Sequence, residues 1–154
     1  MLNIVLFRPE IAYNTGNIGR TCYLTGSKLH IIGPAGFSLD DKHIKKAGLD
    51  YWNKLDVKIY GSYRELREKY KDNRFFFSTT KGDKLYSDIE FKDTDFIVFG
   101  RESSGLPEYI HVENKDNRFK IPMLNGTDRS LNLCNTVSIV VYEALRQINF
   151  INLK

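Results

Sequence analysis

LNIVLFRPEIAYNTGNIGRTC, residues 2–22, is the stretch of sequence that decides the predicted fold class. Its first part, residues 2–7, is almost wholly apolar, as is typical of a strand covered on both faces. The polar segment NTGNIGRTC follows at residues 14–22, and the pattern predicts a helix over residues 17–25. A buried strand that leads into a helix is typical of the units that build parallel sheets.

The same alternation of strand and helix continues along the chain. Short apolar runs predict strands over residues 2–7, 28–32, 57–60, 75–78, 95–99 and 118–121. Helical patterns are found over residues 17–25, 40–47, 62–71 and 132–149. Ser62 and Glu65 have the spacing of a capping box at the start of the third helix. The alternation predicts one α/β domain over residues 1–154, with a mainly parallel sheet flanked by helices.

Composition excludes several classes of protein. The chain has 154 residues, 42% of them hydrophobic, and a net charge of +4, which permits RNA as a partner without requiring it. Cys22 and Cys134 are far apart and near no histidine cluster, so we expect free thiols in a reducing cytoplasm and no metal site. Since no apolar run approaches the roughly 20 residues of a membrane span, we expect no membrane contact.

The loop after the first predicted strand is the first candidate site, because ligands bind beyond the carboxyl ends of parallel strands. Its glycines give GxxG and not the dinucleotide fingerprint GxGxxG. A plain turn explains them equally well, with Asn14 or Thr15 capping the helix and Gly19 letting it pack close to the sheet. Arg20 fits a plain turn poorly, because the dipole disfavours a cation in the first turns of a helix, and we expect it to meet an anion or a substrate.

Two further loops have the composition of ligand sites. FGRESSGLP, residues 99–107, combines glycines that let the backbone approach a ligand with serine donors, although an ordinary capped loop has the same composition. IPMLNGTDRSLNLCNT, residues 121–136, has an apolar rim that suits a flat ring. Ser130 or Asn132 in this segment is also placed to cap the last helix.

NTGNIGR, GRESSGLP and IPM…RSLNL…N, in this order, resemble the three motifs of the SPOUT class of RNA methyltransferases. Length and spacing are most similar to the small stand-alone members that methylate the ribose 2′-hydroxyl of the tRNA wobble nucleoside, position 34, and the similarity runs from residue 1 to about residue 147. The resemblance implies a C-terminal trefoil knot and S-adenosylmethionine as methyl donor. It also implies the tRNA anticodon stem-loop as partner and a homodimer whose active sites are built from two subunits.

The resemblance assigns roles to individual residues. The catalytic and substrate-facing positions are Asn14, Arg20, Glu102, Ser130 and Asn132. The donor-binding positions are Ser78, Thr79, Gly100, Ile121, Met123, Ser130 and Leu131. The candidate RNA contacts come instead from side-chain chemistry. Arg101, Arg129, Lys81 and Lys84 are candidate phosphate contacts, with plain solvated surface charge as the alternative, and Tyr142 is expected near the RNA site of the partner subunit.

The chain departs from the family pattern at several positions. Ala12 and Tyr13 stand where relatives usually have proline before the first asparagine. Arg101 stands where many have proline, and it adds a cation near the site. Cys134 takes a place often held by a small hydroxyl residue. These changes remove no polar group that the chemistry needs.

Two questions stay open at the level of sequence. The resemblance suggests that Arg20 activates the 2′-hydroxyl, but a guanidinium has donors and no acceptor. Arg20 therefore either stabilises the forming alkoxide while Glu102 or water takes the proton, or acts as the base itself. The second question concerns the alternatives to the enzyme that the resemblance predicts: a non-catalytic RNA- or nucleotide-binding module, or a flavodoxin-like domain, which would need a Ser/Thr-rich phosphate loop that NTGNIGRT does not supply.

The last predicted helix has a sequence pattern that bears on the oligomeric state. Ile139, Tyr142 and Arg146 form a second line at 3- and 4-residue spacing beside the core stripe. An aromatic and an arginine on an exposed stripe are typical of an interface, so this pattern predicts a homodimer.

Overall fold

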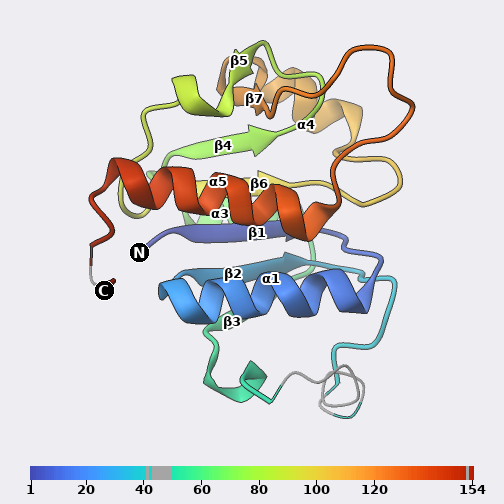
Figure 1. The fold of residues 1–154 in the computed structure, drawn as a ribbon. Coiled ribbons are helices and arrows are strands. Elements are labelled where there is room, and N and C mark those ends of the chain that lie inside the picture. The colour runs from blue at the N-terminus through green and yellow to red at the C-terminus, as the bar shows by residue number, and fades with distance from the viewer. Residues whose placement is uncertain (41, 43–49, 152) are drawn as a thin grey trace.

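The computed structural model describes residues 1–40, 42, 50–151 and 153–154. The described strands form a seven-stranded sheet in the order β3-β2-β1-β6-β4-β7-β5 (Figure 1). Their bounds are β1 Asn3–Phe7, β2 Lys28–Ile32, β3 Val57–Tyr60, β4 Phe75–Ser78, β5 Lys84–Leu85, β6 Phe96–Phe99 and β7 Arg118–Lys120. Each pairing between these strands is parallel, which confirms the predicted α/β class.

Helices cover both faces of this sheet (Figure 1). Their bounds are α1 Ala12–Thr25, α3 Tyr63–Lys69, α4 Glu108–Glu113 and α5 Leu133–Gln147, with short 3-10 turns at η1 Trp52–Lys54, η2 Tyr86–Asp88 and η3 Lys115–Asn117. The helices α1 and α5 lie side by side on one face, where the Thr21 and Ser138 hydroxyls are 3.3 Å apart. Among the described residues, no helix is long and apolar enough to cross a membrane.

Two apolar layers hold the helices to the sheet. Side chains alternate along β1, so that Ile4 and Leu6 join the core beneath α1 and α5. Val5 and Phe7 join the core on the opposite face, beneath α3 and α4. Because the central strands are buried on both faces, they are apolar throughout, which explains why the runs in the sequence predicted them well.

The first helix differs from its prediction. It begins at Ala12, so Asn14 and Thr15 are buried inside it and do not cap it; Ile11 is the N-cap, without a side-chain hydrogen bond. Arg20 consequently lies in the middle of α1, and the argument from the dipole at the first turns was wrong. Gly19 permits close packing, but against η1: a Cβ there would lie 3.0 Å from the Trp52 ring.

The other helix predictions had mixed outcomes. Ser62 caps α3 by accepting from the Glu65 N–H at 3.2 Å, as predicted. The Glu65 carboxylate accepts a hydrogen bond from the Gly61 N–H at 2.8 Å, whereas a capping box would use the N–H of the next residue, Ser62. The helix predicted over residues 40–47 falls largely outside the described residues. The sequence reasoning missed β5 and α4, since elements this short carry no readable periodicity.

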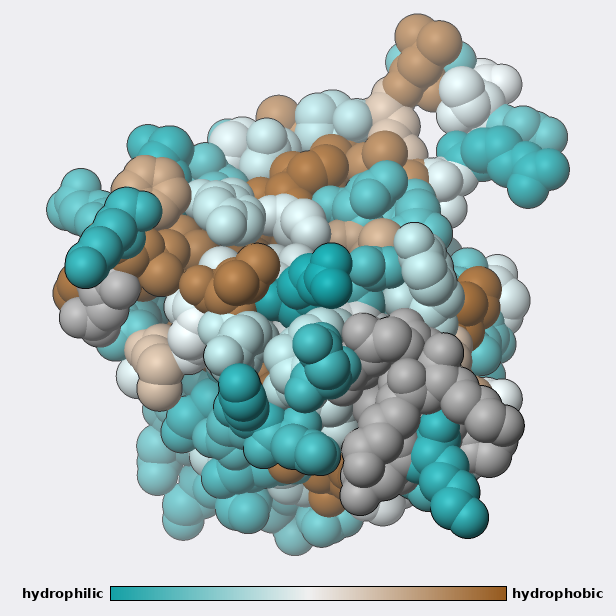
Figure 2. Space-filling model, turned by 60° about the horizontal axis from the view of Figure 1, so that its bottom comes forward, coloured by the Kyte–Doolittle hydropathy of each residue, from teal (hydrophilic) through white to brown (hydrophobic). Residues whose placement is uncertain are grey.

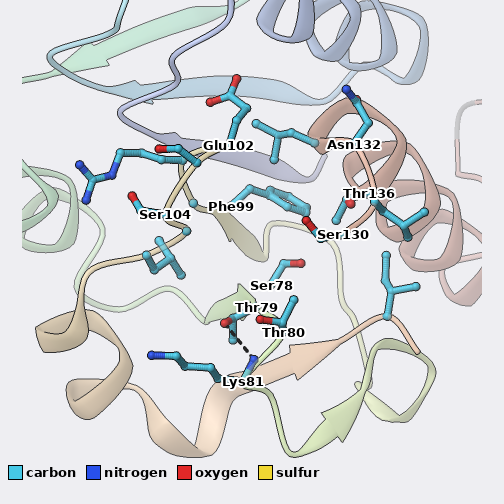
Figure 3. A pocket seen from close by; sticks show the side chains of 18 of the residues that line it. Ser78, Thr79, Thr80, Lys81, Phe99, Glu102, Ser104, Ser130, Asn132 and Thr136 are labelled. Atoms are coloured by element: carbon cyan, nitrogen blue, oxygen red, sulfur yellow. Dashed lines mark hydrogen bonds between the residues drawn. The ribbon is translucent and has the colours of Figure 1, made fainter. Parts of the chain in front are cut away.

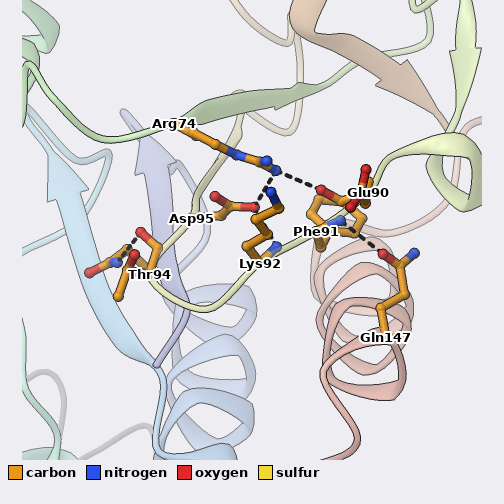
Figure 4. Close-up of polar contacts among 8 residues, drawn as sticks. Arg74, Glu90, Phe91, Lys92, Thr94, Asp95 and Gln147 are labelled. Atoms are coloured by element: carbon orange, nitrogen blue, oxygen red, sulfur yellow. Dashed lines mark hydrogen bonds and ion pairs between the residues drawn. The ribbon is translucent and has the colours of Figure 1, made fainter.

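The amino ends of the strands are fixed by a polar cluster, opposite the ends that carry the candidate loops (Figure 4). Arg74 donates to the buried Asp95 carboxylate at 2.9 Å and to the Glu90 carbonyl at 2.6 Å. Burial raises the pKa of Asp95, while the Lys92 N–H and Arg74 oppose that rise. The Phe91 N–H donates to Gln147 at 2.8 Å, which ties the end of α5 to the same loop.

Candidate functional site

The candidate site is a cavity of about 530 Å³ at the carboxyl ends of β4, β6 and β7 (Figure 3). Three segments line it, from residues 78–81, 99–106 and 121–136, and the first turn of α1 closes one side. The structure therefore brings together the three motif segments. The predicted donor-binding positions all line this cavity: Ser78, Thr79, Gly100, Ile121, Met123, Ser130 and Leu131.

The loop after β6 is a tight hairpin that only glycine permits at its base. Residues Arg101 and Gly105 form a short antiparallel bridge, with hydrogen bonds of 3.1 and 2.9 Å between their backbones. A Cβ at Gly100 would lie 2.3 Å from the Gly105 carbonyl carbon, far inside van der Waals contact. Gly105 itself has a φ of +67°, in the left-handed region. Both glycines of this motif thus have a backbone reason to be present.

Glu102 holds the start of α1. Its carboxylate accepts hydrogen bonds from the Glu10 N–H at 2.8 Å and the Ile11 N–H at 3.1 Å. The Asn14 side-chain amide donates to the same group at 3.4 Å. A carboxylate at a helix N-terminus is stabilised by the free amides and the helix dipole. Glu102 thereby supplies the cap that Ile11 lacks.

Asn132 joins the start of α5 to α1. Its Oδ1 accepts from the Cys134 N–H at 2.9 Å, so Asn132 is the N-cap of α5, as one of the two predicted alternatives had it. Its Nδ2 donates to Asn14 Oδ1 at 3.1 Å. Three of the predicted catalytic residues, Asn14, Glu102 and Asn132, consequently form one connected cluster at the edge of the cavity.

A second carboxylate near the cavity was missed by the sequence reasoning. Glu10 accepts hydrogen bonds from the Ser103 N–H at 2.9 Å and the Ser103 hydroxyl at 2.7 Å. These bonds, helped by the charge of Arg101, lower the pKa of Glu10. The loops before α1 and after β6 are thus joined twice: Glu102 accepts from the first loop, and Glu10 accepts from the second. Residues 93 positions apart offer no local signal of this pairing.

Arg20 lies outside the cavity of its own chain. It is exposed, and its guanidinium carbon lies 5.6 Å from the centre of the Tyr51 ring. The Tyr51 hydroxyl donates to the Gly16 carbonyl, which fixes that ring against α1. Among the described residues, Arg20 has the Tyr51 ring as its recorded contact and no recorded anionic partner, so its predicted contact with an anion or substrate stays a prediction.

The predicted RNA contacts divide into two groups. Arg101 and Lys81 line the cavity, and Lys81 also pairs with Glu108 at 3.3 Å. Arg129 and Tyr142 are exposed and are not among the described residues that line it. Lys84 donates to the Asp116 carbonyl at 3.0 Å, away from the described lining.

Several lining residues were not predicted from the sequence. The cavity is also formed by Ile11, Thr80, Leu106, His111 and Thr136, while Leu133, which also lines it, was predicted as part of the apolar rim. Of the unpredicted residues, Ile11, Thr80 and His111 lie outside the three motif segments, and only the fold brings them to the cavity. Within the described part of the chain, no histidine, cysteine, aspartate and glutamate side chains gather as a metal site would require. Cys22 and Cys134 are free thiols, as predicted.

Comparison with known proteins places this site in a family. The profile of the SpoU rRNA Methylase family matches residues 1–142. The tRNA (cytidine(34)-2'-O)-methyltransferase of Escherichia coli (strain K12) is 46% identical over 151 residues, which cover 97% of this chain and 96% of that protein. The similarity therefore extends over nearly the full length of both proteins.

Solved structures agree with this comparison. A structure described as giving insights into the 2-OH methylation of C/U34 on tRNA has a TM-score of 0.89 and 39% identity, covering 97% of each chain. The SpoU methyltransferase AviRb from Streptomyces viridochromogenes, solved with the cofactor AdoMet, has a TM-score of 0.83. It is 24% identical, covers 97% of this chain and 61% of its own, and shows the shared fold alone. With its motif loops gathered at one cavity and the family profile matching residues 1–142, this chain belongs to the SpoU rRNA methylase family.

Proposed function

We propose that this protein transfers a methyl group to the ribose 2′-hydroxyl of the wobble nucleoside of tRNA, position 34, acting in the cytoplasm. The observation that carries the proposal is the convergence of three loops on one cavity, with Asn14, Glu102 and Asn132 joined at its edge. The Escherichia coli relative named for this activity, 46% identical over nearly its whole length, supports the same substrate.

The cavity suits S-adenosylmethionine as the methyl donor. Ile121, Met123 and Leu131 supply an apolar rim for a flat ring, and the backbone at Gly100 lines the same cavity. Ser78, Thr79 and Ser130 supply hydroxyls along the same wall. When bound, the donor supplies an electrophilic methyl group on a sulfonium, so the protein has to align the attacking oxygen with it.

The chemistry requires a proton acceptor and a group that stabilises developing negative charge. In the transfer, the oxygen–carbon bond forms as the sulfur–carbon bond breaks, and the hydroxyl loses its proton. Three donors already occupy the Glu102 carboxylate, which favours water over Glu102 as the acceptor. Arg20 then stabilises the forming alkoxide through its charge. The alternative, in which Arg20 removes the proton, requires a guanidinium without its proton and is disfavoured.

A homodimer would bring the Arg20 of one subunit to the cavity of the other. Arg20 is exposed on α1, outside the cavity of its own chain, and a partner's Arg20 would complete the site. The face formed by α1 and α5 exposes the large side chains Tyr23, Leu24, Ile139 and Tyr142. Figure 2 shows apolar side chains gathered where the carboxyl ends of α1 and α5 lie together. Burial of such a face is a favourable basis for association.

The anticodon stem-loop is the part of tRNA that this site is proposed to engage. The anticodon bases in its loop are unpaired and can be presented on a protein surface. Arg101 and Arg129 are proposed to contact phosphates, and Tyr142 to contact the nucleotide from the partner subunit. The trefoil knot of the SPOUT class is proposed for the segment from β7 to α5, which forms one wall of the donor cavity.

Incubation of the protein with unmodified tRNA and S-adenosylmethionine, followed by mass spectrometry of nucleosides and of nuclease fragments, tests the proposal. We expect one ribose methyl group, in the fragment that contains position 34. A protein that binds the donor and tRNA but leaves all riboses unmethylated would be the non-catalytic module. A methyl group elsewhere in the tRNA would reject the proposed target.

A further inference from the structure

His111 on α4 is a buried polar residue in the cavity that has no partner for one ring nitrogen. The side chain is 4% exposed, and it lines the cavity next to the loops of the family motifs. Its Nδ1 is shielded from solvent and has no hydrogen-bond partner among the residues that the structure describes. Buried polar groups are nearly always hydrogen-bonded, so an unpaired nitrogen at a cavity wall points to a group of the ligand.

The surroundings of His111 are positively charged. Burial is the main cause that lowers the pKa of His111, and the charges of Lys81 and Arg118 lower it further. Glu108 acts in the opposite direction, as does the Leu106 carbonyl. The imidazole is therefore uncharged at neutral pH and can donate a hydrogen bond, within a field that favours an anion.

The cavity has two polar ends, and His111 belongs to one of them. Figure 3 shows Glu102 and Asn132 at one end and Thr79, Thr80 and Lys81 at the other. Lys81 pairs with Glu108 at 3.3 Å, and Glu108 lies one turn before His111 on α4, so the imidazole belongs to the second end. The reacting methyl group belongs at the Glu102 end, and the apolar rim takes the adenine ring. The amino-acid tail of the donor is then left for the Lys81 end.

We propose that His111, together with Lys81, forms the subsite for the carboxylate of the donor's amino-acid tail. This inference rests on the proposed function, and it concerns a residue outside the three family motifs. The Nδ1–H of His111 donates to a carboxylate oxygen, and the Lys81 ammonium adds its charge at the mouth of the cavity. His111 is thus a determinant of donor specificity, separating ligands with the amino-acid tail from bare nucleosides.

Two ligands that differ by this tail test the assignment by calorimetry. S-adenosylhomocysteine contains the carboxylate, and 5′-methylthioadenosine lacks the whole amino-acid tail. We expect His111→Ala to weaken S-adenosylhomocysteine binding about tenfold, as the loss of one hydrogen bond to a charged group predicts. Binding of 5′-methylthioadenosine should change less than about twofold, and His111→Gln, which keeps an N–H donor, should regain part of the loss.

Equal losses for both ligands would overturn the proposal, because His111 would then hold the nucleoside or the fold. Unchanged binding of both ligands would overturn it as well. Tyr109→Ala changes an exposed residue of the same helix outside the described lining, and it should leave both affinities as in the wild type. Thermal unfolding of each variant reports whether α4 stays intact.

Failure of the proposed methyltransferase function and failure of the His111 subsite give different results in these experiments. Wild-type protein that binds neither ligand would reject the methyl-donor cavity altogether. Wild-type protein that binds S-adenosylhomocysteine with the expected His111 dependence, yet methylates no tRNA, would reject the activity and support the subsite.

Discussion

Asn132 at the start of α5 donates a hydrogen bond to Asn14 inside α1, with 3.1 Å between Nδ2 and Oδ1. The Asn132 side-chain oxygen Oδ1 already accepts from the Cys134 N–H, so the side-chain amide is held in one orientation. Asn14 in turn donates to Glu102. One line of hydrogen bonds therefore joins the first, third and second motif segments. A substitution at one of its three side chains changes the hydrogen bonds of the other two.

Asn132→Asp separates the two roles of Asn132. Aspartate still caps α5, and its charge suits a helix N-terminus, but it cannot donate to Asn14. We expect the melting temperature to stay near wild type and turnover to fall by roughly tenfold or more. Asn149→Asp introduces the same charge at an exposed position beyond the far end of α5, outside the motifs and the described lining, and should leave turnover unchanged. Equal damage by both variants would show that charge alone is responsible.

Glu102→Gln tests whether Glu102 is a clamp or a base. The amide keeps the size of the side chain but turns one acceptor into a donor facing the N–H groups of Glu10 and Ile11. If Glu102 serves to hold the start of α1, the Glu102→Gln protein should be less stable by roughly 1–3 kcal/mol of unfolding free energy, measured in urea. Glu68→Gln on the exposed side of α3 is the matched control. A stable Glu102→Gln protein without activity, and without the acidic limb of its pH–rate profile, would instead identify Glu102 as the base.

Gly100→Ala should disable the loop after β6. The new Cβ would lie 2.3 Å from the Gly105 carbonyl carbon and 2.5 Å from the Leu106 nitrogen, both backbone atoms that cannot move freely. We expect a loss of roughly 1–3 kcal/mol in stability and of measurable donor binding. Gly61→Ala, where the nearest atom is a flexible Glu65 oxygen at 3.4 Å, should be close to wild type in both measurements. Normal donor binding by Gly100→Ala would show that the loop tolerates the change.

The central strands could be read from the sequence because burial on both faces leaves a nearly continuous apolar run, as in FIVF of β6. The predicted strands at residues 28–32, 57–60 and 75–78 agree with β2, β3 and β4 to the residue. The gathering of the motif loops followed from the rule that parallel strands end at one edge. The donor-binding positions came from the family resemblance, and each of them lies on such a loop.

The start of α1 could not be read in the same way. Its cap is the Glu102 carboxylate, which accepts a hydrogen bond from the Ile11 N–H 91 residues earlier in the chain. A local sequence pattern therefore cannot predict this cap. The same cause explains why Asn14 was assigned to a turn and Arg20 to the first turns of the helix. His111 was missed because a lone histidine on a short helix has no signature until the fold places it in a cavity.

His30 should make the stability of the fold depend on pH. It is fully buried, with 3.1 Å from Nδ1 to the Tyr60 hydroxyl and 3.0 Å from Nε2 to Asn3 Oδ1. Burial, with Lys58 adding to it, lowers the pKa of His30 to about 4. The stabilisation is complete above the unfolded value of about 6.5 and is lost as the pH falls toward 4, by roughly 3 kcal/mol.

Urea unfolding at several pH values measures this dependence. His30→Gln removes the titrating group, so the difference between wild type and variant should shrink as the pH falls from 6.5 to 4. A difference that stays constant over this range would mean that His30 titrates alike in the folded and unfolded states. Comparing the two proteins at each pH cancels the contributions of the carboxylates, including Asp95.

Arg20→Ala is expected to reduce turnover by roughly 10²-fold, as removal of one transition-state donor does. Because Arg20 lies outside the cavity of its own chain, S-adenosylhomocysteine binding should remain at the wild-type level. Arg20→Lys keeps the charge and loses the planar fork, so it should retain part of the activity if the role is electrostatic. An Arg20→Ala protein with near-normal turnover would remove Arg20 from the reaction.

Mixed dimers show which subunit supplies Arg20. In a hybrid of one Arg20→Ala subunit and one Asn132→Asp subunit, a site built across the interface combines an intact Asn132 with the partner's intact Arg20. One of the two sites is then whole, so random mixing of two nearly inactive proteins should restore roughly a quarter of wild-type activity. If Arg20 served its own chain, each cavity in the hybrid would carry one defect, and activity would stay at the level of the single variants. A sedimentation mass near the 17.9 kDa of one chain would contradict the dimer directly.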